Sequence, residues 1–160
     1  MLSAWTGIRW VLRAVGTCLL VAVFLAVTGC GGGDDSEPDR FSEGYNATIR
    51  QLGTVNQELA GLDVSAKSSR AIANELDRFG AALQRTRTRL GRLEPPERAA
   101  NEFAALLSAL DDSVDASSRA AAAARAIEPA RQRRALRQLG AATREVDRAQ
   151  DALGRAVQTG

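Results

Sequence analysis

Residues 72–96, IANELDRFGAALQRTRTRLGRLEPP, decide the fold of this chain. Apolar positions recur there at alternating intervals of three and four residues, the spacing that lines one face of an α-helix. The stretch stops at two consecutive prolines, which lack an amide donor and disfavour helical geometry in the preceding residue. The sequence therefore predicts a helix with one buried face and a turn at residues 94–96. The positions of that face are Ile72, Leu76, Phe79, Leu83, Thr86, Leu90 and Leu93.

The same spacing occurs in three other segments, so we expect four helices in all. Glu128-Pro129 marks the boundary between the third and the fourth segment. Residues 63–70 separate the first two only weakly; a short turn and a continuous bent helix both fit them, and the turn is favoured. The positions expected to be buried are Tyr45, Ile49, Leu52, Val55, Leu59 and Leu62 on the first segment, Phe103, Leu107, Leu110, Val114, Ser117, Ala121 and Ala124 on the third, and Leu136, Leu139, Ala142, Val146, Ala149 and Leu153 on the fourth.

Helical segments joined by short links favour antiparallel neighbours. Ala, Glu, Lys, Leu and Arg make up about half of the residues after position 29, a composition typical of long helices and coiled coils. The sequence therefore predicts an all-α, elongated, antiparallel up-and-down bundle of four helices over residues 41–160, about 40 Å long. With a tight reversal at residues 94–96, the charges expected to face one another are Arg92 and Glu97, Arg87 and Glu102, and Arg78 with Asp111 and Asp112.

The N-terminal segment has the pattern of a secretory signal. Residues 1–13 contain two arginines and no acid, and residues 14–29, AVGTCLLVAVFLAVTG, contain no charge, as in a positive region followed by an apolar one. The apolar run is shorter than the 20 or so residues that a membrane-spanning helix needs. It ends at Val27-Thr28-Gly29-Cys30, an aliphatic residue and two small ones before a cysteine. This ending resembles the lipobox of bacterial lipoproteins.

The resemblance implies that Cys30 carries a covalent diacylglycerol on its sulfur and, after cleavage, becomes the first residue of the mature chain, with or without an N-acyl chain such as palmitate. The chain would then consist of a signal peptide at residues 1–29, the lipidated cysteine and a flexible acidic tether at residues 30–40, and the helical domain. An uncleaved signal anchor is the alternative. Both interpretations predict a protein at the cell membrane with its helical domain on the extracytoplasmic side.

The charge balance argues against a nucleic-acid-binding protein. Without residues 1–29 the chain has 19 basic and 19 acidic residues, whereas proteins that bind nucleic acid usually have a clear basic excess. Cys18 leaves with the signal, so no disulfide is expected in the mature chain.

The residue types also exclude most catalytic chemistry. The chain has no histidine, and after Cys30 it has no cysteine and a single lysine, Lys67. Triads of the Ser-His-Asp or Cys-His kind and the usual zinc sites are therefore impossible. Asp111, Asp112 and Asp115 are close in sequence, but carboxylates on an exposed turn without other ligands bind cations weakly. We expect no enzyme, no metal and no cofactor beyond the lipid of Cys30.

Two arginine clusters are the candidate contact surfaces. The first has few acids near it in sequence and is the better candidate for a ligand or partner; the second is weaker, because acids are expected opposite it. We expect a non-catalytic helical interaction module that docks onto another envelope protein or a second copy of itself. The alternative is a binder of anionic cell-wall polymer or lipid. A solvated helix face is the simpler interpretation of both clusters. The first cluster is Arg131, Arg133, Arg134 and Arg137; the second is Arg85, Arg87, Arg89 and Arg92.

Overall fold

The structure, a computed structural model, describes residues 36–60 and 67–158. Within these ranges it contains four α-helices, one 3-10 turn and no strand. The predicted all-α bundle of four helices is confirmed. The signal segment and Cys30 lie outside the described residues, as do Leu62 and the side chains of Val55 and Leu59. The elements are α2 (Ser36–Ala60), α3 (Ser69–Leu90), η1 (Glu97–Ala99), α4 (Ala100–Arg125) and α5 (Pro129–Gln158).

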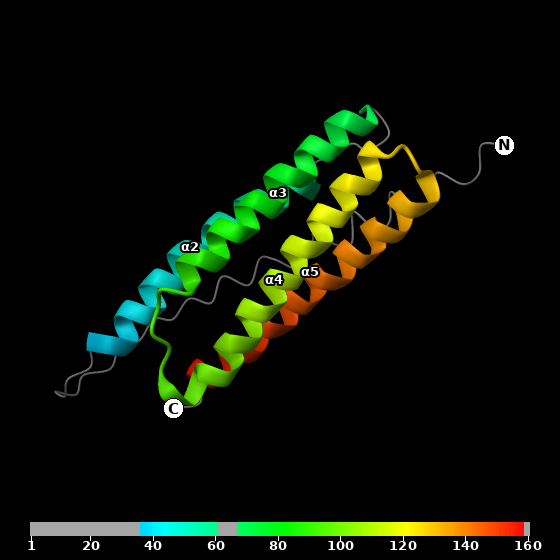
Figure 1. Cartoon of the computed structure of the whole chain (residues 1–160). Helices are drawn as coiled ribbons and strands as arrows, with labels where there is room; N and C mark the ends of the chain where they lie inside the picture. The colour runs from blue at the N-terminus through cyan, green and yellow to red at the C-terminus, as the bar shows by residue number, and fades with distance from the viewer. Residues whose placement is uncertain (1–35, 61–66, 159–160) are drawn as a thin grey trace.

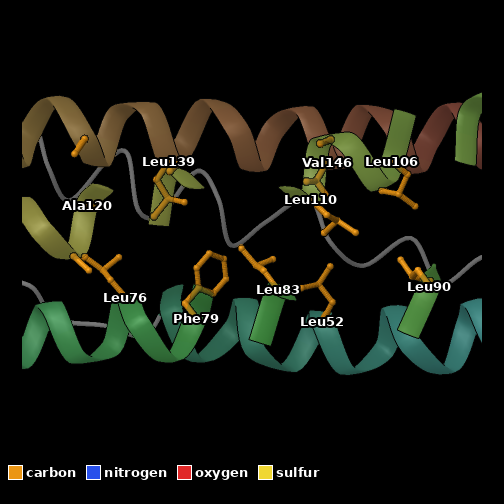
Figure 2. Close-up of a cluster of buried hydrophobic side chains, with 14 of the residues drawn as sticks. Leu52, Leu76, Phe79, Leu83, Leu90, Leu106, Leu110, Ala120, Leu139 and Val146 are labelled. Atoms are coloured by element: carbon orange, nitrogen blue, oxygen red, sulfur yellow. The ribbon is translucent and has the colours of Figure 1, made fainter. Parts of the chain in front are cut away.

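The helices run alternately up and down the long axis of the bundle (Figure 1). Each packs against its neighbour in sequence, and the α3–α4 and α4–α5 contacts are more extensive than the α2–α3 contact. The pair α2 and α3 faces α4 and α5, with the core side chains between them (Figure 2). Among the described residues, α2 and α5 do not form an extensive contact of their own. The bundle is therefore closed tightly on three of its four sides.

The core follows the predicted spacing most closely on α3. All the expected positions from residue 72 to residue 90 are buried, and Leu93, just beyond the helix, is half-buried against the core. On α4 the buried face is rotated from the predicted one, because Leu106 and Ser113 are fully buried while Leu107 and Val114 are half-buried. From Ala116 onward α4 adds only alanines and Ser117 to the core. Small side chains there let α4 approach its neighbours closely.

The chain reverses direction between α2 and α3, which run antiparallel (Figure 1). Helix α3 begins with Ser68, whose hydroxyl accepts a hydrogen bond from the amide of Ala71 at 3.3 Å. Serine in this position satisfies one of the free amides of the first turn. The favoured turn interpretation agrees with this arrangement, although residues 61–66 lie outside the described part.

The link between α3 and α4 is longer than a tight reversal, so the predicted charge register is wrong. Residues 91–96 form a turn and an extended stretch before η1, and α4 begins beyond the end of α3 (Figure 1). Arg87 therefore pairs with Asp111 at 3.0 Å rather than with Glu102. This partner is nine residues further along α4, about 13 Å. Arg78 pairs with Glu75 on its own helix.

Helix α2 begins earlier than expected. Its first residue is Ser36, so the last five residues of the predicted tether at residues 30–40 belong to the helix. Pro38 lies in the first turn, where a missing amide donor breaks no helical hydrogen bond. Glu37 and Asp39 are acids near the positive end of the helix dipole, which also favours a helix start. Among the described residues, no helix is long and apolar enough to cross a bilayer.

Candidate functional site

The first cluster forms one continuous surface on α5. All four arginines are exposed, whereas Leu139 on the same helix is buried in the core. At about 100° per residue, the four positions fall within roughly 160° of arc on the side away from the buried face. We call this surface the α5 arginine cluster. Its members are Arg131, Arg133, Arg134 and Arg137.

The α5 arginine cluster is almost without counter-charge. Arg131 lies 3.9 Å from Glu128, and both side chains are more than half exposed. The other three arginines form no ion pair with any part of the chain that the structure describes. No acid occurs from residue 129 to residue 144. Of the four, Arg131 lies in the first turn of α5, where the positive end of the helix dipole disfavours a cation.

The second cluster is divided by the fold. Arg87 contacts α4 through Asp111, while Arg89 contacts α2 through a hydrogen bond to Gln51. These two arginines therefore lie on opposite flanks of α3 and join it to its neighbours. The residues of that cluster left exposed without an ion pair to the described residues are Arg85 and Arg92. The second cluster does not form a single surface as the first one does.

One residue that the sequence analysis did not single out lies beside the α5 arginine cluster in sequence. Ile127, in the turn between α4 and α5, is 73% exposed and has a φ angle of 56°. Among the described residues, Ile127 is the only large hydrophobic residue that is exposed. It is also the only non-glycine residue there with a positive φ. An apolar residue before a proline boundary gives no sign of this in the sequence.

A shallow depression of about 490 Å³ lies at the opposite end of the bundle. One wall is held by Arg98, which donates a hydrogen bond from Nη2 to the carbonyl of Val157 at 3.1 Å. An arginine there satisfies a carbonyl at the C-terminal end of α5. Glu102 has one carboxylate oxygen that is buried without a hydrogen-bond partner among the described residues. The depression lies between η1, the start of α4 and the end of α5. It is lined by Arg98, Glu102, Ala152, Arg155 and Ala156.

The open side of the bundle carries two perturbed ionisable groups. Burial, with a smaller contribution from the charge of Asp151, raises the pKa of Tyr45 on α2 to about 12. Burial also raises the pKa of Asp147 on α5, followed by repulsion from Asp151, while Arg144 opposes the shift. The phenol is therefore neutral at physiological pH.

The predicted acidic residues of α4 do not gather around a cation position. Asp111 is engaged by Arg87, and Asp112 and Asp115 are exposed. No group of three potential metal ligands occurs in the part of the chain that the structure describes.

Compared with known proteins, the chain matches no family model, no curated protein and no solved structure.

Proposed function

We propose that the protein is a lipid-anchored, non-catalytic interaction module on the extracytoplasmic side of the cell membrane, and that it docks onto another envelope protein through the α5 arginine cluster. The observation that carries the proposal is the set of exposed arginines without counter-charge at Arg133, Arg134 and Arg137. Like charges gathered on one face of a helix repel one another, and an acidic binding partner would explain their presence.

The two ends of the bundle suit different tasks. Cys30 is six residues upstream of Ser36, so a lipid on it lies at most about 20 Å from the start of α2. The α5 arginine cluster is at the other end (Figure 1), because α4 with its 26 residues spans about 39 Å. An anchor at Cys30 would leave the cluster free to face away from the membrane.

The anchor is tested by replacing the lipidated residue. In wild-type cells we expect the protein in the membrane fraction, with a mass that fits cleavage before Cys30 and addition of diacylglycerol. In Cys30→Ala the lipid cannot be attached, and we expect no lipidated mature form. A wild-type protein that retains residues 1–29 would instead support the uncleaved signal anchor.

The docking surface is tested by neutralising it. The triple variant R133Q/R134Q/R137Q removes three charges without touching the core, and R85Q/R92Q is a control that removes one exposed arginine from α3 and one from the turn after it. After mild solubilisation of the membrane, we expect a protein partner to co-purify with wild type and with R85Q/R92Q but not with the triple variant. Equal recovery with all three proteins would contradict the proposal.

A binder of anionic cell-wall polymer or lipid is the second candidate function. The absence of acids from residue 129 to residue 144 favours it, because a field of one sign attracts polyanions. The two candidates differ in whether a protein partner is recovered. Polymer binding should involve no protein partner and should fall steeply as ionic strength rises, whereas a docked partner should co-purify with the protein at low ionic strength.

A further inference from the structure

Ile127 is exposed at a place where its side chain has no structural use. It follows Ala126, the last residue of the α4 cap, and 73% of it is accessible to solvent. A large aliphatic side chain gains nothing from such exposure. It belongs to the turn between the two most extensively packed helices of the bundle, α4 and α5.

The backbone at this position also disfavours isoleucine. With a φ of 56°, Ile127 is in the left-handed region, which is a genuine outlier for a β-branched residue. Glycine is the usual residue directly after a helix in this conformation, and asparagine is tolerated. Its exposed side chain and left-handed backbone together indicate that an isoleucine is kept here for something other than folding.

The surroundings of Ile127 in the chain define the chemistry of its partner. Residues 125–137 contain five arginines and one glutamate. Arg125 is paired with Asp77 on α3, but the α5 arginine cluster is nearly free of counter-charge. A complementary surface therefore has acids around an apolar centre. Protein interfaces commonly place an apolar anchor at the middle and charged groups at the rim.

A membrane is a poorer match than a protein. Interfacial membrane binding uses a broad apolar face, whereas among the described residues Ile127 is the one large hydrophobic side chain that is exposed. The end also lies away from the start of α2, where the proposed anchor is attached (Figure 1). A pocket on a protein can bury one isoleucine side chain completely. A bilayer surface would offer a single exposed side chain no such enclosed site.

We infer that Ile127 is the apolar anchor of the docking site and that the partner is a protein whose acidic surface surrounds an apolar pocket for this side chain. The inference rests on the proposed function, because it names the partner of the same surface. Arg133, Arg134 and Arg137 then form the charged rim, and Ile127 determines how long the complex lasts.

The test uses two replacements that suit a left-handed backbone, Ile127→Gly and Ile127→Asn, in the full-length chain. Ala130→Asn is the matched control, because it adds the same amide at an exposed position of the first turn of α5. The affinity for the co-purifying protein should fall at least about fivefold in both Ile127 variants and stay unchanged in A130N. Melting temperatures should equal or exceed that of wild type, which excludes loss of folding as the cause.

The other outcomes overturn the inference in distinguishable ways. One outcome is that the Ile127 variants bind the protein partner as wild type does while R133Q/R134Q/R137Q does not. In that case the arginine docking surface is supported, and the role of Ile127 as its apolar centre is wrong. If wild type binds phosphatidylglycerol vesicles but not phosphatidylcholine vesicles, and the Ile127 variants lose this binding, the partner is a lipid surface rather than a protein. If no protein co-purifies with wild type, both the docking function and the role of Ile127 in it are wrong.

Discussion

At the scale of single residues, two buried serines on α4 have opposite roles. Ser117 donates a hydrogen bond from Oγ to the carbonyl of Leu76 on α3, at 2.7 Å. The hydroxyl of Ser113 is buried without a partner among the described residues. Both side chains are fully buried, so the difference between them comes from hydrogen bonding.

Replacing each serine by alanine should therefore change stability in opposite directions. We expect S117A to lower the free energy of unfolding by about 1 kcal/mol, because an interhelical hydrogen bond is lost. S113A should leave it unchanged or raise it by up to about 1 kcal/mol, because an unsatisfied hydroxyl is removed. Urea unfolding followed by circular dichroism checks both. A larger loss in S113A than in S117A would contradict the hydrogen-bond assignment.

At the scale of the helices, glycines distinguish close contacts from open space. A methyl group added at Gly80 on α3 would lie 3.3 Å from the Ser117 hydroxyl and 3.4 Å from its Cβ, whereas one added at Gly154 on α5 would have no neighbour within 4 Å. The Gly80 position therefore fixes how closely α3 approaches α4.

We expect Gly154→Ala to raise the free energy of unfolding by about 0.5 to 1 kcal/mol, because alanine is the better helix former and nothing opposes it. In Gly80→Ala the same gain should be cancelled by crowding against Ser117. The same urea experiment gives both values. An equal gain from the two replacements would mean that α3 and α4 are not in close contact there.

The open edge between α2 and α5 makes stability depend on pH through Asp147. Its pKa is raised in the folded protein, first by burial and then by Asp151, so ionisation disfavours the folded state. Below the unfolded value of about 3.9 the group is protonated in both states and has no effect. As pH rises through and above that value, the penalty appears, and it is present in full at neutral pH.

Replacing Asp147 by asparagine should therefore raise the melting temperature at pH 7, and the advantage should disappear toward pH 3. Asp112→Asn is the control, because it removes the same charge from an exposed position on α4. Thermal unfolding at a series of pH values measures the difference. A gain for D147N that persists unchanged at pH 3 would show that burial of the charge is not its cause.

At the scale of the whole molecule, regular spacing and prolines were enough to predict the helices. The buried face of α3 was predicted almost residue by residue, because strong apolar residues recur there without a break. On α4 the prediction missed Leu106, since alanine and serine give little contrast between the faces of that helix. The register of α3 against α4 depends on the path of residues 91–96, which composition does not define.

The sequence predicted the candidate surfaces less completely than the fold. Both arginine clusters were visible, but only tertiary contacts separate them: Arg87 and Arg89 bind neighbouring helices, whereas Arg133 and Arg134 bind none of the described residues. Ile127 was missed because left-handed geometry at a helix end leaves no mark when the residue is not glycine.

We propose that the end of the bundle opposite the start of α2 makes the functional contact. Photo-crosslinking in native cells tests this most directly, with a probe at Arg134 in the α5 arginine cluster and a matched probe at Arg85 on α3, both in the protein expressed from its full sequence. Mass spectrometry identifies what each probe captures. We expect one protein to be captured from position 134 and not from position 85. Capture of the same molecules from both positions, or of lipid alone, would contradict it.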